Sequence, residues 1–220
     1  EEQCLFAVPT DIPDPRHDEA GHDRAVARAV VQLAHASDGG LFVLFTSHAA
    51  LRRVAGMVRE AIGARWPLLV QGEGPRDYLL RRFRDAGSAV LLGTDSFWEG
   101  VDVPGRPLRC LVLAKLPFKV PSEPLTAARL EALEAAGQDG FRHYLLPLAA
   151  LKLKQGFGRL IRSRSDVGVV VLLDHRVASR PYGRVLLDSL PPADRVIAPW
   201  EAVRTAAEDF FARHGIGAPA

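Results

Sequence analysis

The segment Gln155-Gly-Phe-Gly158-Arg159-Leu-Ile-Arg162 combines a glutamine, two arginines and two glycines. In a helix, positions 155, 159 and 162 follow the spacing i, i+4, i+7 and therefore lie on one face. A guanidinium is always charged and can bind two oxygens at once, so this face could bind phosphates. Each glycine costs a helix about 1 kcal/mol relative to alanine, which close approach of a ligand or a partner domain would offset. A solvated basic face with two incidental glycines is the structural alternative.

A second segment, residues 93–105, reads GTDSFWEGVDVPG and follows an apolar run. Its hydroxyl groups on Thr94 and Ser96 could contact phosphates, and the carboxylate of Asp102 could hold ribose hydroxyls. The alternative is a polar turn that buries Trp98. Taken alone, the segment does not decide between these two interpretations.

The elements that would position these residues follow a simple pattern. Apolar runs predict buried strands, which alternate with amphipathic helices, and this alternation is typical of a parallel sheet with helices on both faces. The three prolines within residues 1–17 predict an irregular lead-in, and residues 116–153 are predicted to form a helical insertion. No polar linker divides the chain, so residues 1–220 are expected to form one domain. The predicted strands are 41–46, 68–70, 89–92, 109–114, 167–173 and 195–197, and the predicted helices include 18–36, 47–62, 76–86 and 200–214.

Ligands of open parallel sheets bind outside the carboxyl ends of the strands. The polar residues just past those ends are Thr46-Ser47, Gln71-Gly72, Gly93-Thr94-Asp95 and Asp174-His175.

Composition limits the function classes. With 48% hydrophobic and 25% charged residues and a net charge of +2, the chain is globular and its overall charge does not require nucleic acid. Residues 152–164 nevertheless concentrate five basic side chains and no acid. No apolar run approaches the ~20 residues of a membrane span and no signal peptide is present, which predicts a cytoplasmic protein without a membrane partner. Cys4 and Cys110 are expected to be reduced, buried thiols without a metal.

Three segments, in this order, resemble motifs IV, V and VI of superfamily 2 helicases: LFVLFTS, LLGTDSFWEGVDVPG and QGFGRLIR. The segments LPFKVPSEP and QGEGPRDYLLRRF are similar to those of DinG/XPD-type DNA helicases, the bacterial DinG-like branch in particular. The resemblance covers residues 41–190. It implies a RecA-like α/β domain, the second of two in an ATP-dependent helicase that moves 5′→3′ on single-stranded DNA.

The resemblance also implies roles for individual residues. Arg162 would be the arginine finger that reaches the γ-phosphate of ATP on the partner domain, with Arg159 and Gln155 beside the same phosphates. The motif V residues that would face the nucleotide and its ribose are Glu99, Gly100 and Asp102. The residues that would contact single-stranded DNA are Thr46, Ser47, Thr94, Arg76, Arg81 and Lys119.

Half of such a motor is missing from the sequence. It contains no Gly-x-x-x-x-Gly-Lys-[Ser/Thr] segment, so ATP with Mg²⁺ would be bound mainly by the first RecA-like domain, and the isolated chain is predicted to be inactive. Asp18-Glu19 imitate the acids of a Walker B motif, but they follow prolines rather than a buried strand and are expected to have no catalytic role. The chain begins at Glu1 without a methionine, which suggests a fragment of a longer protein.

The presence of an iron–sulfur cluster in that longer protein and the role of this chain within it are both left open by the sequence. Relatives of this type include proteins with an iron–sulfur cluster on four cysteines of the first domain, and the two cysteines of this chain cannot supply one. The chain could also be a non-catalytic α/β nucleic-acid-binding or interaction module derived from a helicase. Intact Gln155, Arg159, Arg162 and Asp102 favour the motor, because a module without catalysis has no need of an arginine finger.

Overall fold

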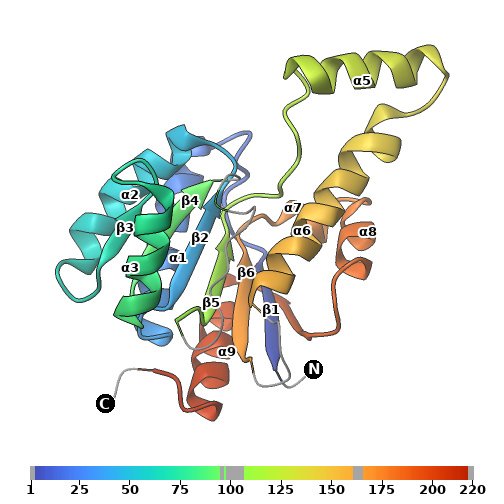
Figure 1. The fold of residues 1–220 in the computed structure, drawn as a ribbon. Coiled ribbons are helices and arrows are strands. Elements are labelled where there is room, and N and C mark those ends of the chain that lie inside the picture. Colours follow the sequence, from blue (N-terminus) through green and yellow to red (C-terminus); the bar gives the residue numbers. More distant parts are fainter. Residues whose placement is uncertain (1–2, 95–96, 98–106, 161–165, 218–220) are drawn as a thin grey trace.

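The computed structural model describes residues 3–94, 97, 107–160 and 166–217, apart from the side chain of residue 159. Strands and helices alternate along these residues (Figure 1). In chain order they are β1 (Cys4–Pro9), α1 (Glu19–Ala36), β2 (Leu41–Phe45), α2 (His48–Ile62), β3 (Leu68–Val70), α3 (Arg76–Ala86), β4 (Val90–Thr94), β5 (Cys110–Leu113), α5 (Pro124–Ala135), the π-helical turn η1 (Phe141–Leu145), α6 (Leu146–Leu160), β6 (Gly168–Leu172), α7 (Arg176–Ser179), α8 (Gly183–Asp188), β7 (Asp194–Ala198) and α9 (Trp200–Arg213).

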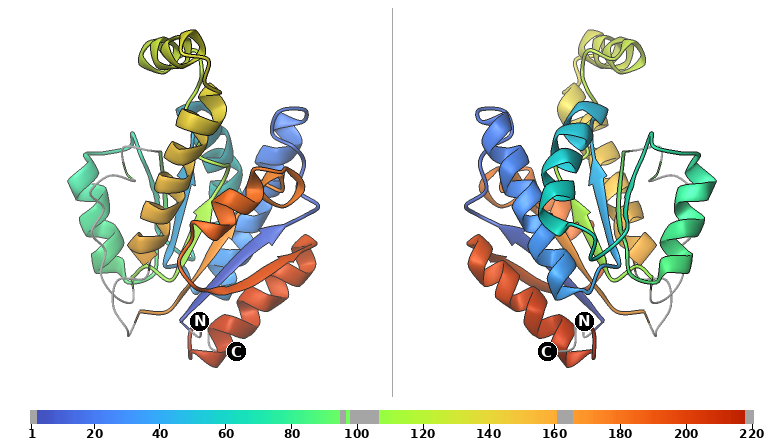
Figure 2. Two further views of the ribbon diagram at one scale, coloured as in Figure 1. Left: turned by 90° about the vertical axis from the view of Figure 1, so that its right-hand side faces the viewer. Right: turned by 90° about the vertical axis from the view of Figure 1, so that its left-hand side faces the viewer.

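The strands form one parallel sheet in the order β3-β4-β2-β5-β6-β1-β7. This confirms the predicted RecA-like α/β class. Successive side chains of each strand enter two separate cores, so that Leu41 and Val43 of β2 lie in one and Phe42 and Leu44 in the other. Helices α1, α2 and α9 cover the first core, and α3, α6 and α8 cover the second (Figure 2). Burial on both faces explains why the strands are apolar throughout.

The N-terminal segment, residues 1–17, differs from the irregular structure predicted for it. Cys4–Pro9 form β1, which is fully buried and lies between β6 and β7. Pro9 ends this strand, and Pro13 and Pro15 follow it. Proline restricts only the backbone near its own position, so residues 4–8 remain free to pair. Their pairing partners lie more than 160 residues away, where no local pattern can show them.

The helical insertion is shorter than the predicted range of residues 116–153. Helix α5 projects from the body of the domain (Figure 1), and Thr126 is its one buried residue. Helix α6, in contrast, packs on the sheet from its first turn through Leu146, Ala149 and Leu153. These residues, together with Phe157, repeat at helical spacing and supply the apolar stripe that the sheet requires. The part that stands away from the sheet therefore ends near residue 145, not at residue 153.

The direction of α6 decides where its motif lies. All strands run the same way, and α6 returns from their carboxyl ends to the start of β6. A Cβ added at Gly168, the first residue of β6, would lie 2.8 Å from the side chain of Leu160 at the end of α6. Residues 155–160, the described part of the QGFGRLIR segment, therefore approach the amino edge of the sheet, whereas Thr46 and Thr94 stand at the carboxyl edge.

Candidate nucleic-acid and nucleotide sites

Two hydroxyl groups follow the carboxyl end of β2. Thr46 is exposed. Ser47 is the N-cap of α2, where its Oγ accepts a hydrogen bond from the backbone N–H of Ala50 at 3.2 Å. The cap uses an oxygen lone pair and leaves the hydroxyl proton of Ser47 available. The positive end of the α2 dipole adds to the attraction of this position for an anion.

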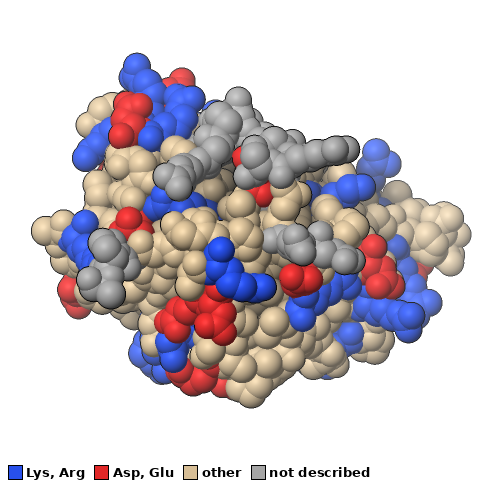
Figure 3. Space-filling model, turned by 90° about the horizontal axis from the view of Figure 1, so that it is seen from below, with Lys and Arg blue, Asp and Glu red and all other residues tan. Residues whose placement is uncertain are grey.

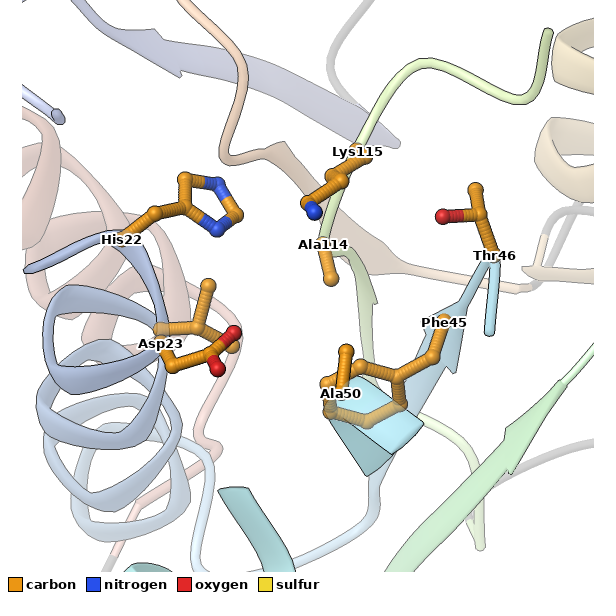
Figure 4. A pocket seen from close by; sticks show the side chains of 8 residues that line it. His22, Asp23, Phe45, Thr46, Ala50, Ala114 and Lys115 are labelled. Atoms are coloured by element: carbon orange, nitrogen blue, oxygen red, sulfur yellow. The ribbon is translucent and has the colours of Figure 1, made fainter. Parts of the chain in front are cut away.

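Thr46 faces a small hollow at the same edge (Figure 4), together with His22, Asp23 and Lys115. Lys115 directly follows Ala114 at the carboxyl end of β5, the strand beside β2. Asp23 accepts a hydrogen bond from Nε of Arg53 at 2.5 Å, and Arg53 also binds Glu19. The charge of the Asp23 carboxylate is therefore balanced by Arg53 of α2, while Lys115 forms no ion pair within the described residues.

His22 forms the buried wall of the hollow, with 1% of its surface exposed. Its Nε2 lies 2.9 Å from the carbonyl oxygen of Leu173, so Nε2 carries the proton and donates. Burial is the main cause that lowers the pKa of His22, and the charge of Lys115 acts in the same direction. The ring is therefore neutral near pH 7, and its Nδ1 has no hydrogen-bond partner within the described part of the chain.

Thr94, at the end of β4, is hydrogen-bonded to Gln71, the residue that follows β3. Oε1 of Gln71 accepts hydrogen bonds from the backbone N–H of Thr94 at 2.6 Å and from its hydroxyl at 3.0 Å. The Thr94 side chain is buried. Its hydroxyl proton is already used inside the protein, whereas the Thr46 hydroxyl has no hydrogen bond to any described residue.

The predicted basic contacts differ in their surroundings. Arg76, in the first turn of α3, is half-buried and lies over the ring of Phe97 at 5.8 Å. Arg81 is exposed on the same helix. Lys119 is half-buried and lies 3.7 Å from Glu123. The structure thus brings Thr46 and Ser47 together with Lys115, while Arg76 and Arg81 lie apart on the β3–β4 side of the sheet.

Asp174, just past β6, is a structural residue. It is completely buried, it pairs with the guanidinium of Arg176 at 2.5 Å, and its Oδ2 accepts from the backbone N–H of Leu116 at 2.9 Å. Burial alone would lower the pKa of Arg176, but hydrogen bonds and charge from Asp174 outweigh it and raise that pKa. This pair ties the segment after β5 to the end of β6.

The amino edge carries the predicted nucleotide contacts. On the last turns of α6, Phe157 and Leu160 are buried while Gln155 and Gly158 are exposed. The backbone of Arg159 belongs to this helix. Seen from this edge (Figure 3), acidic and basic side chains are interspersed over the described surface. Glu99, Gly100, Asp102 and Arg162 lie outside the described residues, as do Asp95, Ser96 and Trp98.

Asp18 and Glu19 are accounted for by local structure. Asp18 is the N-cap of α1 and accepts from the backbone N–H of Gly21 at 2.7 Å. Glu19 forms an exposed ion pair with Arg53. Both acids therefore stand at the start of a helix, away from the strand end that a Walker B motif occupies.

The cysteines do not fit a metal cluster. Cys4 and Cys110 are buried and belong to the two different cores, on opposite faces of the sheet. Burial raises the pKa of both thiols, that of Cys4 to about 12. Within the described residues no group of three or more metal-ligating side chains is found, and no helix is both long and apolar enough to span a membrane.

These features define a RecA-like α/β domain, with hydroxyl groups at one edge and an arginine-bearing helix at the other. The helicase C-terminal domain family matches residues 30–193, and the chain belongs to this family. Within it, the chain is of the DinG/XPD type.

It is 44% identical over 202 residues to the ATP-dependent DNA helicase YoaA of Escherichia coli, a match that covers 92% of this chain and 31% of that protein. It is 45% identical over 160 residues to the ATP-dependent DNA helicase DinG of Photobacterium profundum, covering 70% of this chain and 23% of the relative. The chain thus spans about a third or less of these relatives. The structure of Xpd4 of S. tokodaii shares its fold, with a TM-score of 0.67 at 17% identity over 89% of this chain and 38% of that one.

Proposed function

We propose that this chain is the second motor domain of an ATP-dependent DNA helicase that moves 5′→3′ on single-stranded DNA in the cytoplasm. The observation that carries the proposal is the separation of two sets of groups. Thr46, Ser47 and Lys115 gather at the carboxyl edge, and α6, which carries Gln155, ends with Leu160 at the amino edge. A motor needs such a separation, because strand and nucleotide must be bound at once. The names of the relatives, ATP-dependent DNA helicases, agree with it.

At the amino edge, Arg162 would act as the arginine finger and Arg159 and Gln155 would bind the same phosphates. Glu99, Gly100 and Asp102 would face the nucleotide and its ribose. The exposure of Gln155 supports these roles, since that face of α6 is open to a partner. The first RecA-like domain of the same protein would bring ATP and Mg²⁺ to this face, and the finger would stabilise charge that develops on the transferred phosphoryl group.

At the carboxyl edge, Thr46, Ser47 and Lys115 would bind DNA phosphates. The hydroxyl protons of Thr46 and Ser47 are available, and Lys115 provides an ammonium group beside them. Phosphate contacts carry no sequence information, which suits a motor that moves along any strand. Thr94 could join them only by giving up its hydrogen bond to Gln71. Arg76, Arg81 and Lys119 would be peripheral contacts.

The test uses the protein that carries both RecA-like domains. Arg162→Ala should lower the kcat of DNA-stimulated ATP hydrolysis by about 10³ or more, the scale of arginine fingers, and leave the affinity for oligo-dT nearly unchanged. The double variant Thr46→Ala, Lys115→Ala should show the reverse pattern, with weaker DNA binding and nearly unchanged basal hydrolysis.

Arg164→Ala serves as the matched control, because it removes an arginine two residues from Arg162 and off the spacing of Gln155 and Arg159. The 220-residue chain alone should show no ATP hydrolysis. If Arg162→Ala loses DNA affinity and keeps its kcat, the QGFGRLIR helix is a DNA-binding face and the assignment of the two edges is wrong.

A further inference from the structure

A groove of about 560 Å³ lies beside the carboxyl edge, between the start of α6 and the segment that carries α7 and α8. It is formed by two stretches of chain about forty residues apart. The first is η1 with the first residue of α6, and the second is the link between α7 and α8 together with the first turn of α8. Its wall is mostly apolar. The lining residues are Phe141, Arg142, Leu146, Pro181, Tyr182 and Val185.

The aromatic wall of the groove is rigidly supported. The rings of Phe141 and Tyr182 lie 5.3 Å apart, and each lies 5.5 Å from the ring of Phe118. Each ring comes from a different segment of the chain, and mutual contact fixes their orientations. Tyr182 remains half-exposed and Val185 is 52% exposed, so the groove is open to solvent.

The surroundings of the groove are cationic. Arg142 lines it, and among the residues that the structure describes its one ion pair is with Asp139 at 3.6 Å, which is exposed and therefore weak. The charges that act on Tyr182 are those of Arg176, Asp174, Arg16 and Arg180. Arg176 is paired with Asp174 and Arg16 with Asp14. Arg180 is exposed and forms no ion pair within the described residues, which leaves it as the uncompensated cation of the three arginines. An anionic partner would complement this rim.

The groove is continuous with the edge proposed to bind DNA. Phe118 follows β5 by five residues, three past Lys115, and α7 begins four residues past the end of β6. Neighbouring strands lie about 5 Å apart, so β2, β5 and β6 present their ends within roughly 10 Å of one another. A strand with phosphates at Thr46 and Lys115 would reach the groove within a few nucleotides.

We propose that this groove is a stacking site for a base of single-stranded DNA, an inference that rests on the proposed function. The wall of Tyr182 and Phe141 offers apolar contact to a base, and Arg142 and Arg180 stand where the neighbouring phosphates would pass. Proteins that bind single strands without sequence preference combine these two features, because every base has a π-face.

The experiment measures binding of fluorescein-labelled dT12 to the 220-residue chain at low salt, by fluorescence anisotropy. Tyr182→Ala should weaken binding at least fivefold, the lower end for the loss of one base–aromatic stack, and Tyr182→Phe should bind like the parent chain. A strand of abasic nucleotides should bind the parent chain and Tyr182→Ala equally well. Tyr78→Ala is the matched control, because Tyr78 is also an exposed tyrosine but lies on α3, beside the opposite end of the sheet.

A second variant separates loss of binding from loss of folding. Val185→Glu leaves the three rings in place and adds a negative charge to the groove wall, so it should also weaken dT12 binding with little change in thermal stability. If both variants bind dT12 normally while Thr46→Ala, Lys115→Ala does not, the stacking site is wrong and the DNA-binding edge stands. If the parent chain binds neither strand, the proposed function itself fails. If Val185→Glu alters only the assembly of a longer protein, the groove is a protein interface and the stacking site is refuted.

Discussion

Strand β5 has a basic residue beside each of its ends, and the two are used differently. Arg109, at the amino end, donates to the carbonyl oxygens of Ser37, Asp38 and Gly87 at 2.6–3.0 Å and to Oγ of Ser88. Lys115, past the carboxyl end, faces the hollow beside Thr46 and forms no ion pair within the described residues. The arginine holds two loops of the scaffold together, the one before β2 and the one before β4, whereas the ammonium group of the lysine is not used in this way.

The same contrast holds along the carboxyl edge itself. Thr94 is the last residue of β4 and Asp174 stands just past β6, but both are buried and bonded within the protein. Position at a strand end therefore locates candidate residues, and only the hydrogen-bond partners separate structural residues from residues that can bind a ligand. Four tests with six variants probe the roles of these and neighbouring residues, from the largest expected effect to the smallest.

Asp174→Ala should have the largest effect on stability. It leaves Arg176 as an unpaired charge in a nearly buried position and removes the acceptor for Leu116, and breaking such a pair costs about 3–5 kcal/mol. Urea unfolding should show the loss. A change below about 1 kcal/mol would mean that Asp174 is free enough to act as a ligand.

Arg109→Ala and Lys115→Ala test the two ends of β5 directly. The first should destabilise the chain by about 2–4 kcal/mol, because several carbonyl groups lose a charged donor. The second should change stability by less than about 0.5 kcal/mol, as surface substitutions do, yet weaken dT12 binding. Equal effects of both on unfolding, with no effect on binding, would contradict the division.

His22 should make stability depend on pH. Its folded pKa lies below the unfolded value of 6.5 because burial disfavours the charged ring. The unfolded chain therefore binds more protons below about pH 6.5, and its contribution to stability, complete above that pH, is lost as the pH falls through the folded pKa. In His22→Gln, whose amide can still donate to Leu173, the decrease in Tm between pH 7.5 and pH 5.5 should be smaller. An unchanged decrease would show that His22 does not titrate in this way.

Gly158→Ala and Gly56→Ala have the smallest expected effect and test whether a partner domain approaches α6 at Gly158. Both glycines are exposed in helices, and no described atom lies within 4 Å of an added Cβ. Both substitutions should stabilise the chain by up to about 1 kcal/mol. Only Gly158→Ala should lower ATP hydrolysis in the two-domain protein, because the partner domain would approach that part of α6. Normal hydrolysis in both variants would favour an incidental glycine at position 158.

Much of the architecture was determined by the sequence alone. Continuous apolar runs set the positions of β2 to β6, because a strand buried on both faces must be apolar at every residue. Three segments in this order, LFVLFTS, LLGTDSFWEGVDVPG and QGFGRLIR, together with LPFKVPSEP and QGEGPRDYLLRRF, indicated the family, which the comparisons confirm. The roles of Arg162, Glu99 and Asp102 stay predictions, since these residues lie outside the described part of the chain.

The tertiary structure alone decided which side chains meet. Strand β1 gained its place from partners more than 160 residues away, and His22 meets Leu173 across 151 residues. Lys115 gave no signal of its own in the sequence, because one lysine after a strand looks like any solvated charge until α1 and β2 bring His22 and Thr46 beside it. Local patterns report whether a residue is buried, whereas hydrogen-bond partners depend on strand order and on the direction of α6, both of which are set by packing over the whole chain.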